Sequence, residues 1–328
     1  MKAIILAGGF GTRMYPLTDN IPKCMLPIAG IPLLEWSIEL IKQELKIFEI
    51  IIVVGYKKEV IQNYFGNGEK FGVNITYCSQ DLEKDKGLAA ALLTTRNLIK
   101  SDFVLILGDN LYKGPFRDII EYHNQHQPDA TIQMETVENP SRYGVIINDS
   151  NDIEKVIKLI EKPKNPPTHN VITGFYILNP KIFSVIDLIN PSERGELEIT
   201  DALDYLARTG DVRSVIIGGW RKDIGYPIDL IEASNWILSN ANEDVILSPI
   251  DENVTIISPV FIGKGCEIKN SIIGPYVSIS SNTTIIDSSI RNSIILDNAY
   301  IKGINVVDQV LDDYNNININ FYEPVKTK

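Results

Sequence analysis

A glycine-rich turn and two basic side chains stand near the start of the chain. The turn is the segment LAGGFGTR, Leu6–Arg13, at the end of an apolar run, and Lys23 follows behind Pro22. Glycines let backbone N–H groups approach phosphate oxygens closely, and two cations can flank a triphosphate. A dinucleotide turn would need glycine where Met14 stands, and a P-loop would need Gly-Lys-Ser/Thr. The segment therefore predicts a phosphate-binding turn of another kind.

A carboxylate ends a second apolar run, VLILGDN, at Asp109. A carboxylate at the tip of a buried strand faces the ligand crevice of an α/β sheet and can hold Mg²⁺. By itself, Asp-Asn after a strand is also a common turn former. His123 and His126 stand three apart on an expected helix, but no third ligand accompanies them. We interpret them as a solvated helix face rather than a metal pair.

The composition of the chain limits the kinds of partner that it can bind. A formal charge of -11 and a pI near 4.9 oppose binding to nucleic acid or to anionic membranes, so an anionic ligand must meet locally placed cations. Cys24, Cys78 and Cys266 lie far apart, which supports neither a disulfide framework nor a zinc site and predicts a reduced, cytoplasmic location. No run approaches the roughly 18 apolar residues of a membrane span.

The elements that must position these residues alternate between apolar runs and amphipathic segments over residues 1–246. We expect buried parallel strands at AIILA, EIIIVVG and DFVLILGD, and helices over 33–45, 58–65 and 87–99. Ligands of such sheets collect at the carboxyl ends of the strands. The pattern therefore predicts an α/β domain with its site around 8–13 and 108–110.

After residue 247 an isoleucine returns every five or six residues. The spaced residues are Ile256, Ile262, Ile268, Ile273, Ile279, Ile285, Ile290, Ile295 and Ile301. Fragments such as IGKGCE and IGPYVS are typical of hexapeptide β-helices, in which each side of a triangular coil buries one isoleucine. A small antiparallel sandwich is the alternative, but the sustained spacing disfavours it. We expect a second domain over 247–328 that mediates homo-oligomer formation.

Together these motifs resemble the sugar-phosphate nucleotidylyltransferases, and most closely the long-form glucose-1-phosphate thymidylyltransferases. The resemblance covers essentially the whole chain and is carried by LAGGFGTRMYPLTxxxPK, QDx5GLAAA, LGDN, RYGV, EKP, TGFY, RGELEITDA and WRKDIGYPxDL. It implies a Rossmann-like nucleotidyltransferase domain with a mixed, mostly parallel sheet, followed by a short left-handed β-helix. It also implies that Mg²⁺ is the cofactor.

The resemblance assigns roles to residues of this chain. As catalytic residues it implies Arg13, Lys23, Asp109 and Asp223, of which the two aspartates hold the metal. For the nucleotide it implies Leu6, Gly8, Gly9, Gly11, Thr12, Arg13, Gln80 and Gly87. For the sugar phosphate it implies Tyr143, Gly144, Glu161, Lys162, Ile172, Arg194 and Glu196, although the two glutamates taken alone could be ordinary surface acids.

The expected reaction is in-line attack of a sugar 1-phosphate on the α-phosphorus of a nucleoside triphosphate, with release of pyrophosphate. GLAAA favours dTTP with glucose 1-phosphate, whereas UTP, another triphosphate or a modified sugar stays open. A catalytically inactive regulatory subunit is an alternative, but such a subunit would be expected to lose the charged residues that this chain keeps. Acyl transfer by the tail is disfavoured because no histidine follows His169.

Overall fold

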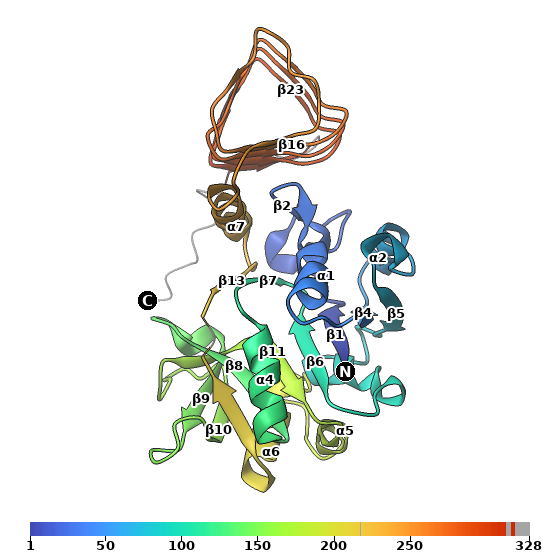
Figure 1. The fold of residues 1–328 in the computed structure, drawn as a ribbon, viewed down its shortest axis with the longest axis vertical. Helices are drawn as coiled ribbons and strands as arrows, with labels where there is room; N and C mark the ends of the chain where they lie inside the picture. Colours follow the sequence, from blue (N-terminus) through green and yellow to red (C-terminus); the bar gives the residue numbers. More distant parts are fainter. Residues whose placement is uncertain (217, 313–315, 319–328) are drawn as a thin grey trace. The chain divides into compact units, whose positions relative to one another are not determined.

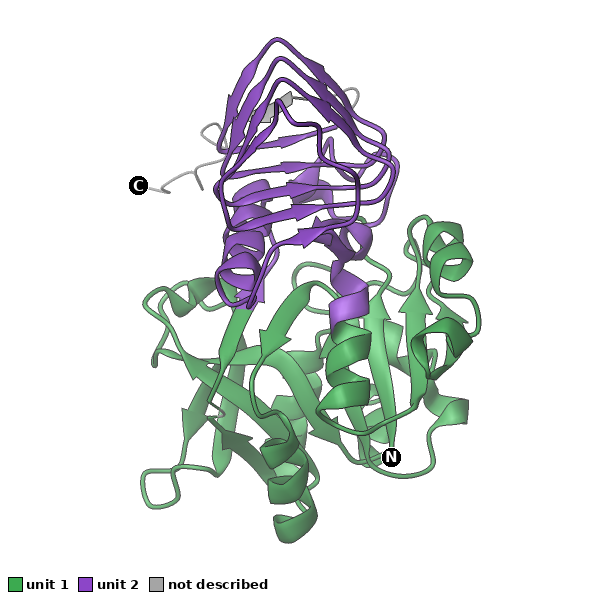
Figure 2. Cartoon of the chain, turned by 45° about the horizontal axis from the view of Figure 1, so that its top comes forward, with its two compact units in different colours: residues 1–10, 37–221 green, residues 11–36, 222–328 purple. Residues whose placement is uncertain are grey.

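The computed structural model describes residues 1–216, 218–312 and 316–318. Two compact units form this part of the chain, each from two chain segments (Figure 2). Unit 1 holds Met1–Phe10 and Ser37–Arg221, and unit 2 holds Gly11–Trp36 with the described residues from Lys222 onward. The units divide the chain differently from the expected boundary near residue 246, so domains 1–246 and 247–328 stay a prediction.

The three apolar runs of the sequence form the parallel centre of the sheet in unit 1. β1 (Lys2–Ala7) pairs in parallel with β4 (Glu49–Val54) and with β6 (Phe103–Leu107), and β5 (Asn74–Ser79) pairs in parallel with β4. Almost every residue of β1, β4 and β6 is buried, which is why these strands are continuous aliphatic runs without polar alternation. The prediction of buried parallel strands is confirmed.

Beyond β6 the sheet becomes partly antiparallel. β11 (Asn170–Leu178) pairs antiparallel with β6, and the order across the sheet is β10-β9-β11-β6-β1-β4-β5, with β8 on β11 and β12 on β8 (Figure 1). The further strands are β8 (Ala130–Thr136), β9 (Gly144–Asn148), β10 (Val156–Glu161) and β12 (Val212–Val215). Two short strands, β7 (Asn110–Lys113) and β13 (Trp220–Asp223), lie outside this sheet. The predicted mixed α/β fold is confirmed.

Helices connect the strands of unit 1. They are α2 (Lys58–Phe65), α3 (Leu88–Leu93), α4 (Arg117–His126), α5 (Lys181–Ile186) and α6 (Ile199–Thr209), together with the 3₁₀ turns η3 (Glu69–Phe71), η4 (Arg96–Leu98) and η5 (Pro140–Arg142). α1 (Leu33–Gln43) begins in unit 2 and ends in unit 1. α2 has the predicted bounds, whereas the helix predicted over 87–99 is split into α3 and η4.

Two adjacent threonines account for this split. The hydroxyl of Thr94 donates to the carbonyl oxygen of Ala91, and the hydroxyl of Thr95 donates to that of Leu92. Side-chain bonds of this kind offer the backbone an alternative to helical pairing. The apolar periodicity continues through the interruption, so the sequence pattern alone predicted one continuous helix.

A triangular β-helix makes up most of unit 2 (Figure 1). Its first side consists of β14 (Val245–Ile246), β16 (Val260–Ile262), β19 (Val277–Ile279), β22 (Ser293–Ile295), β25 (Gln309–Leu311) and β26 (Asn316–Asn318). Its second side consists of β15 (Thr255–Ile256), β18 (Ile272–Ile273), β21 (Ser289–Arg291) and β24 (Asn305–Val307). Its third side consists of β17 (Glu267–Lys269), β20 (Thr284–Ile286) and β23 (Tyr300–Lys302).

The spaced isoleucines stack inside this coil. Ile262 pairs with Ile279, and Ile279 with Ile295, in parallel register along the first side; Ile268 and Ile285 pair in the same way on the third. Eight of the nine predicted isoleucines lie in one buried cluster, and Ile256 packs against it half-buried. Burying each one contributes about 1.5–3 kcal/mol. Parallel pairing excludes the sandwich alternative and confirms the predicted β-helix.

Unit 2 also contains Gly11–Trp36, which continues the glycine-rich signature after Phe10. This segment forms the 3₁₀ turns η1 (Thr12–Met14) and η2 (Lys23–Met25) and a hairpin of β2 (Pro27–Ile28) and β3 (Ile31–Pro32). At the hairpin turn, Gly30 has φ of +76°, and a Cβ built on it would lie 1.9 Å from Cε1 of Phe261 in β16. The backbone N–H of Ala29 donates to Ser234 Oγ at 2.9 Å, on helix α7 (Pro227–Ser239).

The same helix contacts the β-helix as well as the hairpin. Asn235 of α7 donates from Nδ2 to Oδ1 of Asn292, which lies between β21 and β22. Gly11–Trp36, α7 and the β-helix therefore form one packed body. None of the helices in the described part of the chain is long and apolar enough to span a membrane.

Candidate active site

The predicted phosphate turn begins where β1, β4 and β5 end side by side. A Cβ built on Gly8 would lie 2.7 Å from Oε1 of Gln80, and the carbonyl oxygen of Gly8 accepts from the N–H of Tyr56 at 3.0 Å. Gln80 is held in turn, because its Nε2 donates to the carbonyl oxygen of Asp85 at 2.6 Å. Gly9 faces open space. The structure thus brings the predicted nucleotide residues Gly8 and Gln80 into contact.

Gly87 is glycine because another backbone crosses it. It has φ of +99°, and a Cβ there would lie 2.3 Å from the carbonyl oxygen of Leu197. The N–H of Ala89 donates to that same oxygen, and the N–H of Leu197 donates to the carbonyl of Lys86. Packing accounts for this glycine without a ligand. It also joins the segment expected to read the base to the segment RGELE, which is expected to hold the sugar phosphate.

Asp109 follows β6, as predicted. Gly108, between them, donates its N–H to the carbonyl oxygen of Leu6 in β1, which is buried beneath the turn. Asn110 donates from Nδ2 to Oδ1 of Asp109 at 3.0 Å and accepts at Oδ1 from Arg221 at 2.7 Å. Asn110, which donates to the carboxylate of Asp109, is therefore itself held in place by the guanidinium of Arg221.

Sequence reasoning missed Arg221. Its side chain is 8% exposed, its Nε donates to Glu135 at 2.8 Å, and its guanidinium lies 5.6 Å from the ring centroid of Tyr143. Burial lowers the pKa of Arg221, but Glu135 outweighs that effect and the net shift is upward, so the charge is retained. The only signal for it in the sequence was its place inside the motif WRKDIG.

The predicted sugar-phosphate residues lie together in unit 1. The N–H of Lys162 donates to the carbonyl oxygen of Tyr143 at 3.0 Å. A Cβ on Gly144 would lie 2.6 Å from Cδ1 of Ile172 and 2.9 Å from Oγ1 of Thr200. Each of these three close contacts joins different strands or loops. Together they bring β9, the end of β10, β11 and the start of α6 close to one another.

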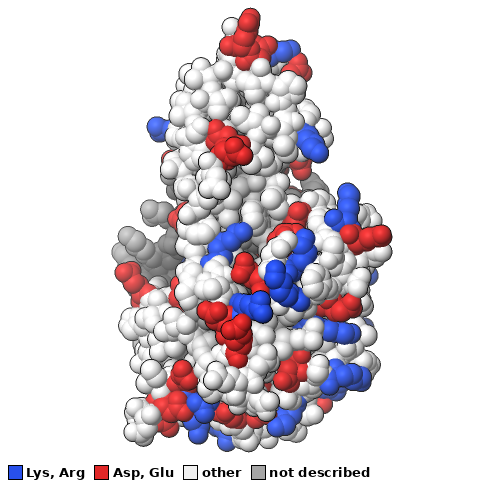
Figure 3. Space-filling view, in the orientation of Figure 1, with Lys and Arg blue, Asp and Glu red and all other residues white. Residues whose placement is uncertain are grey.

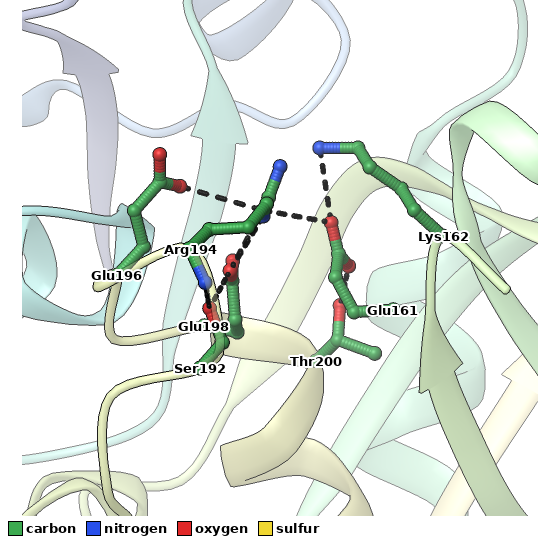
Figure 4. A network of polar contacts seen from close by, with 7 residues as sticks. All are labelled: Glu161, Lys162, Ser192, Arg194, Glu196, Glu198 and Thr200. Atoms are coloured by element: carbon green, nitrogen blue, oxygen red, sulfur yellow. Dashed lines mark hydrogen bonds and ion pairs between the residues drawn. The ribbon is translucent and has the colours of Figure 1, made fainter.

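Arg194 is the centre of a network of carboxylates (Figure 4). Its Nη2 lies 2.7 Å from Oε1 of Glu198 and 3.4 Å from oxygens of both Glu161 and Glu196. Glu198, which the sequence reasoning missed, is 5% exposed, whereas Arg194 is 42% exposed. Burial lowers the pKa of Arg194, but the three glutamates outweigh burial and raise it.

Glu161 joins both cations of this network. Its Oε1 lies 3.0 Å from Nζ of Lys162 and also faces Arg194, while its Oε2 accepts from the hydroxyl of Thr200 at 2.6 Å (Figure 4). Burial, followed by the charges of Glu198 and Glu161, raises the pKa of nearby Asp201. Three glutamates against two cations leave the network with net negative charge. It therefore offers acceptors for hydroxyl groups as well as donors for a phosphate.

In unit 2 the signature glycine makes room for the predicted lysine. Gly11 has φ of +66°, and a Cβ on it would lie 2.9 Å from Cβ of Lys23 and 3.1 Å from Thr18. Thr18 donates from its hydroxyl to the carbonyl oxygen of Gly11 at 3.1 Å. Thr12 begins the turn η1 directly afterwards. The turn fixes the direction in which the chain leaves the glycines.

Arg13 and Asp223 are the other predicted residues of unit 2. The guanidinium of Arg13 lies 5.3 Å from the ring centroid of Tyr226, and it forms no ion pair within the described part of the chain. Asp223 ends β13 half-buried, and its neighbour Lys222 contacts Asp229 and Glu232. Carboxylates such as Asp109 and Asp223 are the hard oxygen ligands that Mg²⁺ takes alongside phosphates, so the donor set fits that ion.

One of the two histidines, His123, departs from the prediction of a solvated helix face. His123 is buried, its Nδ1 lies 2.8 Å from Oγ1 of Thr131, and its Nε2 lies 3.3 Å from Asp102. His126 is exposed, as predicted. The prediction that His123 lies on the surface is wrong, because its side chain faces β8 from α4. There the buried hydroxyl of Thr131 forms a hydrogen bond with the imidazole ring.

Comparisons with known proteins identify the family of the chain. The sequence pattern of the family described as "Nucleotidyl transferase" matches residues 2–240. The chain therefore belongs to the nucleotidyl transferase family. It is 34% identical to a glucose-1-phosphate thymidylyltransferase of Streptomyces griseus over 329 residues, covering 95% of this chain and 91% of that protein.

Relatives of other nucleotide specificity resemble the chain at 30–42% identity, although over a smaller share of it. The chain is 42% identical to the UTP–glucose-1-phosphate uridylyltransferase AglF of Haloferax volcanii over 236 residues, covering 71% of this chain and 95% of that protein. A solved UDP-glucose pyrophosphorylase complexed with UDP-glucose is 30% identical, with a TM-score of 0.67, covering 73% of this chain and 99% of that one. The chain is thus a sugar-phosphate nucleotidyltransferase, of a family that generally uses divalent metal ions.

Proposed function

We propose that the chain transfers a thymidylyl group from dTTP to glucose 1-phosphate and releases pyrophosphate. The similarity to the thymidylyltransferase of Streptomyces griseus supports this choice because it extends over 95% of the chain, tail included. The observation that carries the proposal is the contrast between two cation environments. The network around Arg194 combines cations with hydroxyl acceptors, as a sugar phosphate requires, whereas Arg13 has no acidic partner among the described residues, as suits a polyanion.

The reaction needs no protein nucleophile. The sugar phosphate is already ionised at neutral pH, so an oxygen of it attacks the α-phosphorus and the bond to the pyrophosphate breaks. In the proposal Lys162 and Arg194 hold the attacking phosphate, while Arg13 and Lys23 contact the triphosphate. The chain's contribution is to hold two anions in line and to counter the charge that develops.

Mg²⁺ is the proposed ion, and Asp109 and Asp223 would hold it. When bound, it would supply charge neutralisation on the phosphate oxygens. Within the chain, Arg221 and Asn110 orient the first of these carboxylates through the contacts described above. Gln80 is proposed to read the base, because its amide offers both a donor and an acceptor to a pyrimidine edge.

A matrix of substrates tests the proposal. Pyrophosphate release is measured for dTTP, UTP, ATP, CTP and GTP, each paired with glucose, galactose and N-acetylglucosamine 1-phosphates. We expect the highest kcat/KM for dTTP with glucose 1-phosphate, and loss of turnover when EDTA removes the metal. A preference for UTP would instead align the chain with AglF, and release from no pair would contradict catalysis itself.

The β-helix is proposed to mediate assembly of identical subunits. Its outward-facing side chains include the exposed residues Ile257, Ile272 and Tyr300. Sedimentation of the full chain is expected to show an oligomer, and replacing Ile272 by aspartate is expected to weaken it. A full-length chain that sediments as a monomer would remove this role.

A further inference from the structure

The start of helix α7 lies directly against Arg13. The guanidinium carbon is 5.3 Å from the ring centroid of Tyr226, the residue that precedes the helix. A Cβ built on Gly225 would lie 3.2 Å from Nη1 of Arg13, so the guanidinium lies close above the backbone at this position. Tyr226 and Gly225 thus contact two parts of the same guanidinium. All three residues belong to unit 2.

Asp229 fixes the turn that carries the ring. Its Oδ2 accepts from the N–H of Gly225 at 2.9 Å and of Tyr226 at 2.8 Å, and its own N–H donates to the carbonyl oxygen of Tyr226. Its Oδ1 lies 3.0 Å from Nζ of Lys222. An acid in the first turn of a helix is also favoured by the helix dipole. The backbone beneath Arg13 is therefore held by one side chain from the next turn.

An aromatic platform restrains a cation without cancelling its charge. A carboxylate beside Arg13 would compete with a triphosphate for the same donors, whereas a ring face attracts the guanidinium and leaves its N–H groups available. Arg194, by comparison, already donates to Glu198. The ring therefore suits an arginine that must meet a polyanion in a fixed orientation.

We propose that Tyr226 is a positioning residue for Arg13, held in place by Asp229, and that it sets the affinity and reactivity of the nucleoside triphosphate. The inference rests on the proposed function, since it takes Arg13 as the side chain that meets the triphosphate. It adds a residue outside the set that the sequence motifs assigned.

A double-mutant cycle in the full-length protein tests the inference. Tyr226→Leu is expected to lower kcat/KM for the triphosphate about tenfold while changing KM for the sugar phosphate less than about twofold. Tyr226→Phe, which keeps the ring, should recover most of the loss. Tyr64→Leu, which removes an exposed ring of helix α2 in unit 1, is the matched control and should behave as wild type.

The decisive comparison uses the Arg13→Ala background. If the ring acts through Arg13, adding Tyr226→Leu there should cost less than about twofold. Binding of dTTP, measured by titration calorimetry on the same four proteins, gives the cycle without turnover. An equal loss in both backgrounds, or a Phe variant as impaired as the Leu variant, would overturn the inference.

The outcomes separate this inference from the proposed function. If wild type releases pyrophosphate and Tyr226→Leu matches it, the positioning role alone fails. If wild type releases none with any substrate pair of the matrix, the function and the inference fail together.

Discussion

Arg194 in unit 1 and Arg13 in unit 2 have opposite surroundings, although both are proposed to meet phosphates. Arg194 touches three glutamates, one of them buried, and its pKa is raised by them after the opposing effect of burial. Arg13 lies over a tyrosine ring and forms no ion pair within the described residues. Acidic and basic side chains also alternate over unit 1 on the face drawn in Figure 3.

The difference shows how an acidic protein can bind anions of two kinds. A cation embedded among acids has little net field, so its ligand must bring hydroxyl donors as well as charge. A cation restrained by a ring keeps its field for a ligand that is charge alone. The chemistry of the neighbours, more than the count of arginines, therefore distinguishes the proposed sugar-phosphate side from the triphosphate side.

The contrast between Arg194 and Arg13 has meaning only if the chain catalyses phosphoryl transfer by stabilising charge. Asp109→Asn is the most severe test of that assumption. The change removes one proposed metal ligand but little volume, so we expect turnover to fall at least about a hundredfold with the fold intact. Pyrophosphate release and circular dichroism are the measurements. Asp118→Asn, on an exposed helix turn, is the control. Activity near the wild-type level would show that Asp109 has no such role.

Arg13→Ala should separate binding from stability. We expect kcat/KM for the triphosphate to fall about a hundredfold, because charge stabilisation of the transferring phosphate is lost. The unfolding midpoint should shift by less than about 2 °C, since the change breaks no ion pair in the part of the chain that the structure describes. Steady-state kinetics and thermal unfolding measure the two effects, with Arg117→Ala as the surface control. A large loss of stability would mean that Arg13 is structural.

Arg194→Ala should show the opposite balance. It leaves Glu198 buried beside Glu161 and Glu196, so we expect the free energy of unfolding to fall by about 1–3 kcal/mol at neutral pH. KM for the sugar phosphate should rise as well. Urea unfolding at neutral pH tests this, and an unchanged stability would remove the contrast with Arg13.

The smallest expected effect is on stability and concerns His123, a basic group that is buried. Burial lowers its pKa below the ordinary 6.5, although the contact with Asp102 opposes that shift. Below pH 6.5 the unfolded chain gains a proton first, so stability should fall with pH at a limiting slope of about 1.4 kcal/mol per unit. Urea unfolding should show this extra slope in wild type and not in His123→Gln. Parallel profiles would contradict it.

The fold was predictable where burial requires apolar residues at a short, regular spacing in the sequence. Ile4, Ile51 and Leu105 belong to aliphatic runs that are typical of buried parallel strands, and the sustained spacing of the isoleucines favours a β-helix coil. The motifs also predicted residues that the structure brings together, such as Tyr143 and Lys162, but their role in binding a sugar phosphate stays a prediction.

Contacts between distant segments were not predictable. Glu198 and Arg221 are ordinary charged letters in the sequence, and only the folded backbone puts one behind Arg194 and the other beside Asn110. His123 looked like a surface residue because its partner Thr131 lies on a strand, not on its own helix. No local sequence pattern in residues 11–36 indicates that they pack with the β-helix.

Gly30 has φ of +76° and lies under Phe261, so the hairpin turn tolerates no side chain while that ring is present. The tail therefore cannot be exchanged between relatives as an independent module. A graft from another enzyme would have to bring an aromatic residue of matching size, or the recipient would have to change the turn in compensation. Chimaeras designed at the end of α7 alone would separate Gly30 from Phe261, two residues whose sizes must match.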